Sequence, residues 1–176
     1  MNKRKGVKNS TRNLIFWLIV SGGIILDQVS KFLVKTNMGY LESLPVIPGI
    51  FHLTYIINQG AAWSILTGYR WFFVIIGIAV LIGILIFRHL FVKKDLVLDI
   101  GLAFLVAGAT GNLIDRFLFG GVIDFFDLTI INFAIFNVAD CFIVLAVIII
   151  IYHLLIFPLI QQEKEKNRCK QATSDD

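Results

Sequence analysis

The chain has 176 residues, of which 57% are hydrophobic and only 16% are charged, and its mean hydropathy is +0.83. Soluble domains carry roughly a quarter charged residues, so this composition excludes an ordinary soluble globular protein and indicates the membrane class. The net charge of +4 does not indicate nucleic acid, because the basic residues are grouped around the apolar stretches. We therefore expect no nucleic-acid partner.

Four apolar stretches reach the length of about 20 residues that a bilayer-spanning helix needs. In chain order they cover residues 14–34, 71–91, 96–119 and 140–160. The first follows a basic segment, but no clear small-residue cleavage site comes after it, so we expect a retained helix and not a signal peptide. The sequence predicts an all-α integral membrane protein with four transmembrane helices, in one domain over 1–160 with a polar tail over 161–176.

The basic residues predict the orientation of these helices. They lie before the first stretch, between the second and third, and after the fourth: Lys3, Arg4, Lys5, Lys8, Arg12, Arg88, Lys93, Lys94, Lys164, Lys166, Arg168 and Lys170. The other two connections, 36–70 and 120–139, contain a single lysine or arginine, Arg70. Because positive residues stay in the cytoplasm during insertion, we expect both termini there and both of these connections on the outer side.

The first outer connection carries Pro45 and Pro48 and then "GIFHLTYIIN", whose β-branched and aromatic residues favour an extended, β-like segment on the membrane surface. We expect the segment from Pro45 to Asn58 to close over a substrate as a lid. The second outer connection, "GGVIDFFDLTIINFAIFN", is unusually apolar for a loop. It is expected to pack against the bundle or enter the membrane interface.

Several polar residues interrupt the apolar pattern, and each has a purely structural interpretation. Asp27 and Lys31 are four residues apart with the acid first, the favourable order for an ion pair on one helix. Asp115 and Arg116 could anchor the third helix at the lipid headgroups. A loop aspartate such as Asp124 or Asp127 is usually a turn former, and Asn137 with Asp140 has the spacing of a capping box.

Their convergence favours a functional interpretation. One membrane level, toward the outer side, is expected to hold Asp27, Lys31, Asn58, Asn112, Asp115, Arg116, Asp124, Asn137 and Asp140. Polar groups inside an apolar bundle need one another or a function. Two neighbouring carboxylates can share a proton, so that one activates water and the other protonates a carbonyl oxygen. This chemistry needs no cofactor, and a metal site without histidine ligands does not fit zinc.

Five short blocks carry a resemblance to a known family. "DQVSK", "NQGAAWS", "GNLIDR", "GGVIDF" and "FNVAD", in this order from Asp27 to Asp140, resemble the bacterial lipoprotein signal peptidases, or type II signal peptidases. The resemblance implies an aspartic endopeptidase of the bacterial inner membrane, with its active site toward the outer face. It would remove the signal peptide of a prolipoprotein immediately before a diacylglyceryl-modified cysteine, in contact with membrane lipids.

By position in these blocks, the resemblance implies that Asp124 and Asp140 are the catalytic pair. It implies supporting or substrate-binding roles for Asp27, Lys31, Asn58, Asn112, Asp115, Arg116 and Asn137. Asn112 and Asn137 would orient the carboxylates or water, and Asn58 and Arg116 would contact the substrate. Asp115 would be a structural acid paired with a basic neighbour.

The chain departs from the family pattern at two positions. Ala134 replaces a frequent proline, and Cys141 follows Asp140 where serine or alanine is common. Cys141 could make the activity sensitive to thiol reagents. From the residues alone, two other protein classes stay open: a small proton-coupled transporter or channel subunit, which uses intramembrane charges as relays, and a purely structural membrane subunit.

Overall fold

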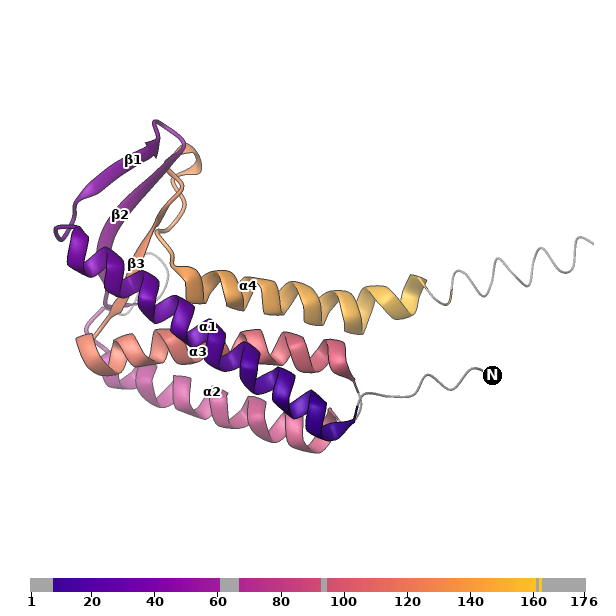
Figure 1. Ribbon diagram of the computed structural model, residues 1–176. Helices are drawn as coiled ribbons and strands as arrows, with labels where there is room; N and C mark the ends of the chain where they lie inside the picture. Colours follow the sequence, from indigo (N-terminus) through magenta and orange to yellow (C-terminus); the bar gives the residue numbers. More distant parts are fainter. Residues whose placement is uncertain (1–7, 61–66, 93–94, 161, 163–176) are drawn as a thin grey trace, which may run out of the picture.

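The computed structural model describes residues 8–60, 67–92, 95–160 and 162 of the chain (Figure 1). It contains four long helices: α1 (Asn9–Asn37), α2 (Arg70–Phe91), α3 (Leu96–Phe119) and α4 (Val138–Ile151), which continues through a π-helical stretch, η3 (Tyr152–Ile156), to Ile160. Each is long and apolar enough to cross a membrane, which confirms the predicted helical membrane fold.

The start of α1 and the end of α4 lie at the same end of the bundle (Figure 1). Their placement in the cytoplasm stays a prediction. The predicted tail over 161–176 lies outside the described residues except for Gln162.

Polar contacts, more than hydropathy, set where two of the helices start. α1 begins before its apolar run because Arg12 is buried: its Nε lies 3.0 Å from Asp99 Oδ2 of α3, and its Nη2 donates to the Val92 carbonyl at 2.7 Å. α4 begins at Val138 because Asn137 caps it. Asn137 Oδ1 accepts the N–H of Asp140 at 3.1 Å, and Asp140 Oδ2 accepts the N–H of Asn137 at 3.1 Å. The capping box expected from the sequence is therefore present.

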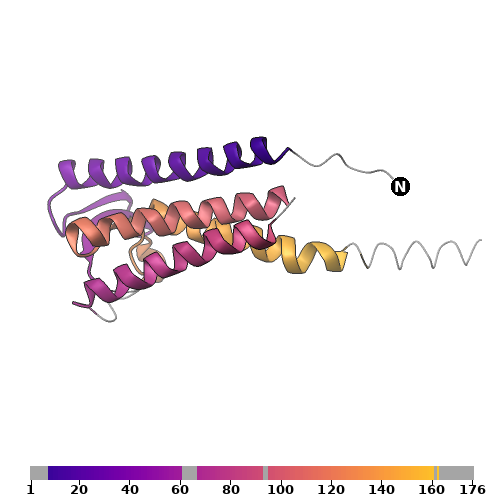
Figure 2. The ribbon, with the colours of Figure 1, turned by 90° about the horizontal axis from the view of Figure 1, so that it is seen from below.

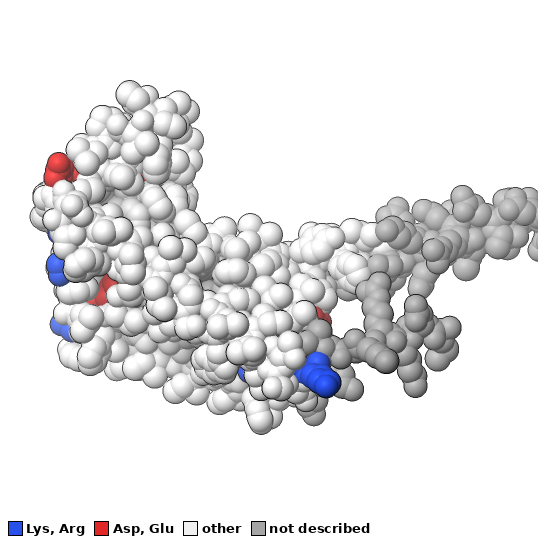
Figure 3. All heavy atoms as spheres, in the orientation of Figure 1, with Lys and Arg blue, Asp and Glu red and all other residues white. Residues whose placement is uncertain are grey.

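Helix α3 is the centre of the bundle and packs against α1, α2 and α4 (Figure 2). A Cβ added to Gly23 of α1 would lie only 2.8 Å from the Cβ of Ala107 of α3, so glycine is what allows these helices to approach so closely. By contrast, α2 and α4 turn most of their apolar side chains outward, as helices facing lipid do. In the space-filling view the charged side chains gather near the two ends, with an uncharged band between them (Figure 3).

The two connections that the sequence predicts on the outer side both contribute to a three-stranded antiparallel sheet in the order β1–β2–β3, which projects sideways from one end of the bundle (Figure 1). The strands are β1 (Ser43–Ile47), β2 (Phe51–Asn58) and β3 (Val122–Asp127), and a short 3-10 helix, η2 (Thr129–Ile131), follows β3. The predicted extended segment in the first connection is confirmed. The interpretation of Asp124 as a loop residue was wrong: it lies on β3, whose apolar run is buried because it packs between β2 and the helices.

Candidate active site

Two carboxylates from separate elements line one cavity of about 690 Å³. Asp124 is on β3, and Asp140 is in the first turn of α4. Asn137 connects them: its Nδ2 donates to Asp124 Oδ1 at 2.6 Å, while its backbone N–H donates to Asp140 Oδ2 at 3.1 Å. The helix cap and the carboxylate pair thus depend on the same asparagine.

Two further amides complete the hydrogen bonding of the pair. Asn112 Nδ2 donates to Asp140 Oδ1 at 2.8 Å, and Asn58 Nδ2 donates to Asp124 Oδ2 at 3.2 Å. The orientation of Asn112 is fixed from its other end, because its Oδ1 accepts hydrogen bonds from Asn137 Nδ2 and from Lys31 Nζ, each at 3.1 Å. Every oxygen of the two carboxylates therefore accepts one N–H.

The two carboxylates differ in their surroundings. Asp124 is only 3% exposed, whereas Asp140 is half-buried and lies at a helix N-terminus, which favours negative charge. Burial, reinforced by the charge of Asp140, raises the pKa of Asp124 to about 7, although hydrogen bonds from Asn137 and Asn58 oppose the shift. The pair can hold one proton near neutral pH, with Asp124 as its carrier.

Behind the pair, three charged side chains form a buried cluster. Lys31 Nζ lies 2.9 Å from Asp27 Oδ2 and 2.8 Å from Asp115 Oδ2, and all three residues are almost completely shielded from solvent. The ion pair expected within the first helix is therefore present, and Asp115 has the basic partner expected for it. This cluster reaches the carboxylate pair through Asn112.

Arg116 lines the cavity beside the carboxylates. Its Nη1 donates to the carbonyl of Asn112 at 3.3 Å and its Nη2 to the carbonyl of Gly60 at 3.5 Å, both of them long bonds. The guanidinium also lies over the ring of Phe73. Beyond Gly60 the "NQGAAWS" block lies outside the described residues, which resume at Thr67.

All of the site residues expected from the sequence lie in this one region, whereas Asp127 does not join it. Asp127 Oδ2 accepts a hydrogen bond from Thr54 Oγ1 at 2.7 Å, on the sheet and away from the cavity. Among the residues that the structure describes, no three or more His, Cys, Asp or Glu side chains are placed to hold a metal ion.

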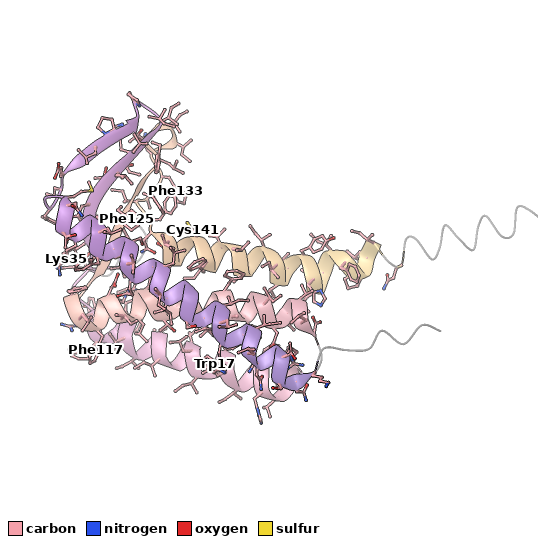
Figure 4. The ribbon with its side chains drawn as sticks, in the orientation of Figure 1. Trp17, Lys35, Phe117, Phe125, Phe133 and Cys141 are labelled. Atoms are coloured by element: carbon pink, nitrogen blue, oxygen red, sulfur yellow. The ribbon has the colours of Figure 1, made fainter. Side chains whose placement is uncertain are left out.

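The apolar part of the cavity was missed by the sequence analysis. Its walls come from α4 and the second outer connection, in the corner between the sheet and the bundle where Phe133 and Cys141 lie (Figure 4). They include Leu128, Ile131, Phe136, Val144, Leu145 and Ile148. In the sequence these residues look like ordinary lipid-facing positions. They differ from lipid-facing residues only because the fold brings them together in one cavity wall. Cys141 is exposed and lies on this wall directly after Asp140.

Gln28 was also missed as a site residue. Its Nε2 donates to Asp27 Oδ2 at 3.1 Å and to Asp115 Oδ1 at 3.0 Å. Its position inside the "DQVSK" block was the one available signal.

Known proteins resemble this chain over most of its length. The family model described as signal peptidase (SPase) II matches residues 12–156. The lipoprotein signal peptidase of Brevibacillus brevis is 46% identical over 132 residues, which are 75% of this chain and 89% of that protein. The lipoprotein signal peptidase of Enterococcus faecalis is 40% identical over 165 residues, covering 93% and 99% respectively.

Solved structures match as well. One described as a bacterial membrane enzyme at 2.3 Å resolution, obtained by the in meso method, has a TM-score of 0.77 and 39% identity. The match covers 88% of this chain and 93% of that chain. A second such structure, at 1.9 Å resolution, has a TM-score of 0.74 and 39% identity and covers 88% and 98%.

Proposed function

The chain belongs to the signal peptidase II family, and we propose that it is an aspartic endopeptidase that cleaves diacylglyceryl-modified prolipoproteins immediately before the lipidated cysteine. The family makes it a multi-pass bacterial membrane protease of lipoprotein processing. The aspartic mechanism rests on one observation above all: two carboxylates of unequal burial line one cavity and are joined by Asn137.

The unequal surroundings of the two carboxylates support a different role for each. Asp140, ionised at the start of α4, takes a proton from a water molecule as the water oxygen attacks the scissile carbonyl carbon. Asp124, protonated, gives its proton to the carbonyl oxygen, so the tetrahedral intermediate forms without a free oxyanion. Asp140 then protonates the leaving nitrogen, and Asp124 recovers its proton as the carbonyl re-forms. Both carboxylates return to their starting states.

The cavity supports a lipidated peptide as substrate. Its polar end carries the two carboxylates with Asn58 and Arg116, and its remaining walls are apolar. A peptide bond at the polar end would leave the acyl chains of the modified cysteine, or the signal peptide, along apolar residues such as Val144 and Ile148 of α4. Arg116, with its two long hydrogen bonds, is available to contact the substrate backbone.

The distribution of charge supports the proposed placement in the membrane. The carboxylates lie at the end of the bundle opposite the buried Arg12 and the half-buried Arg88, near the sheet. With basic residues on the cytoplasmic side, the active site faces outward from the bacterial inner membrane. Residues 1–160 would then form the peptidase unit, and 161–176 a cytoplasmic tail.

Cleavage of a diacylglyceryl-modified prolipoprotein by the purified protein in lipid–detergent micelles tests this proposal. We expect cleavage by the wild type and by Asp127→Asn, and none by Asp124→Asn or Asp140→Asn. Asp127 is the matched control, because it lies on the same strand as Asp124 but outside the cavity. Cleavage by Asp140→Asn would limit Asp140 to capping the helix. A folded wild type that cleaves nothing would favour the transporter interpretation.

A further inference from the structure

The buried charges behind the carboxylate pair hold the two segments that carry it. Asp27 Oδ1 accepts the backbone N–H of Ala139 at 2.9 Å, directly before Asp140 in the chain. Asp115 Oδ2 accepts the backbone N–H of Ile123 at 3.1 Å, directly before Asp124. Each catalytic aspartate therefore follows a residue whose backbone N–H donates to a buried carboxylate on a different element, α1 in one case and α3 in the other.

Two side chains of α1 then join these carboxylates to each other. Lys31 Nζ lies 2.9 Å from Asp27 and 2.8 Å from Asp115. Gln28 Nε2 spans the same two residues at 3.1 and 3.0 Å, and also lies 3.3 Å from the Gly111 carbonyl of α3. The four side chains Asp27, Gln28, Lys31 and Asp115, here named the clamp, connect the start of α4 to β3 through a continuous set of hydrogen bonds.

We propose that Gln28 is a positioning residue for the reaction, because the clamp that it completes sets the separation between the carboxylates of Asp124 and Asp140. Gln28 does not line the cavity, so it acts through Asp27 and Asp115 and not on the substrate. The inference rests on the proposed function, since it assigns Gln28 a role in that reaction.

The same geometry leaves the side chains of Asp27 and Lys31 on α1 little room to move. A Cβ on Gly111 of α3 would clash with the carboxylate of Asp27, so this carboxylate lies directly against the α3 backbone. Lys31, which is 1% exposed, has its donors taken by Asp27, Asp115 and Asn112. A buried ammonium whose three donors are all paired with fixed oxygen atoms resists displacement, because moving it would leave its charge unpaired.

The separation of the carboxylates has a measurable consequence. Two interacting acids titrate in two steps, and the gap between their apparent pKa values grows as the charges come closer. Other charges face the pair, namely Arg116 on α3 and Lys31 on α1. Gln28 is neutral, so its replacement by Met changes no charge, and a change in the gap would report a change in geometry.

The test is the titration of aspartate carboxyl carbons by ¹³C NMR in labelled protein in micelles, with signals assigned through Asp124→Asn and Asp140→Asn. In Gln28→Met the gap is expected to narrow by about one pH unit. In the cleavage assay, kcat is expected to fall about 10- to 100-fold with little change in KM, since misplacement of reacting groups acts on the chemical step. Gln28→Asn, whose shorter amide reaches one carboxylate at most, should give an intermediate gap.

The matched control is Arg12→Met, which breaks a buried contact between the same two helices at the other end of the bundle. It is expected to lower the unfolding temperature while leaving both titration steps in place. If Gln28→Met and Gln28→Asn fold and keep the wild-type gap, Gln28 is structural and the proposal fails. Because the NMR titration needs no turnover, the two proposals can fail separately. A gap that is narrower in Gln28→Met than in the wild type, when the wild type cleaves nothing, would reject the proposed function alone.

Discussion

Asn137 Nδ2 lies 2.6 Å from Asp124 Oδ1, although the two residues belong to different elements and Asn137 is also the cap of α4. Capping and catalysis can be separated at this position. Serine caps helices about as well as asparagine but has no amide to donate to Asp124. In Asn137→Ser we therefore expect the helix start to persist while kcat falls by about 10-fold or more.

Asn137→Ala is the comparison for this prediction, because it loses the cap as well. It should lower the free energy of unfolding by about a further 1 kcal/mol relative to Asn137→Ser. Thermal unfolding and cleavage rates measured on both variants check this. A serine variant with the wild-type kcat would show that Asn137 acts only as a cap.

The raised pKa of Asp124 predicts the pH dependence of cleavage. Its burial, reinforced by the charge of Asp140, moves this pKa from 3.8 to about 7. Because the mechanism needs Asp124 protonated, kcat/KM should fall about tenfold per pH unit above this pKa. Rates measured across this range in one buffer system check the prediction. A rate that keeps rising through pH 8 would exclude Asp124 as the acid.

The same shift predicts how stability depends on pH. Asp124 binds its proton more tightly in the folded state, so its contribution to stability is fully present below pH 3.8 and is lost as pH rises through about 7. The loss is on the order of 4 kcal/mol at most. Asp124→Asn carries no charge, so above pH 7 it should unfold at a higher temperature than the wild type. Below pH 4 the unfolding temperatures of Asp124→Asn and the wild type should no longer differ by this effect. If the variant and the wild type unfold at the same temperature both above pH 7 and below pH 4, the prediction is wrong.

Cys141 predicts sensitivity to thiol reagents. It is exposed on the cavity wall next to Asp140, so a maleimide adduct would occupy the space of the substrate. Alkylation is expected to abolish cleavage in Cys169→Ser, where Cys141 is the single cysteine, and to leave Cys141→Ser active. Mass spectrometry confirms the adduct. Full activity of a completely alkylated protein would show that the substrate does not pass this wall.

At the other end of the bundle, Asp99 predicts a large effect on stability alone. It is 1% exposed, and its carboxylate lies 3.0 Å from Arg12 Nε and 2.9 Å from Arg88 Nε. Asp99→Asn removes the negative charge that balances both guanidiniums and should cost about 3–5 kcal/mol. Asp95→Ala, which removes a helix cap nearby and a contact with the ring of His153, should cost about 1–2 kcal/mol. Activity per folded molecule should be unchanged in both, and a specific loss in Asp99→Asn would indicate coupling to the active site.

The sheet predicts a movement upon substrate binding. Every residue of β1 is exposed, and β1 pairs only with β2 among the described strands. Spin labels at Val46 of β1 and Val147 of α4 would report closure of the sheet over the cavity. Asp124→Asn is expected to bind substrate without cleaving it, and in this variant we expect the distance to shorten when a prolipopeptide is added. An unchanged distance would contradict the prediction that the sheet closes over the substrate as a lid.

The sequence by itself determined the four helices of the membrane fold and pointed to the polar residues that line or support the candidate site, apart from Gln28. A long apolar run in a bilayer folds as a helix, because the helix satisfies all of its backbone hydrogen bonds within the segment. The four helices could therefore be predicted from composition and length. Polar residues are so costly there that their positions pointed to the site without any coordinates. The boundaries of α1 were less predictable, because the partner of Arg12, Asp99, is remote in the sequence.

Only the tertiary structure decided how the site is built. Strand β3 resembled a loop because its two buried faces hide the alternation that marks a half-exposed strand. The cavity wall on α4 consists of residues identical in kind to those facing lipid. Gln28 is an ordinary polar neighbour in the chain, and it acquires a role because α1 brings it between Asp27 and a carboxylate of α3. Contacts between distant segments arise from packing, and the local pattern of residues does not encode which oxygen will accept which hydrogen bond.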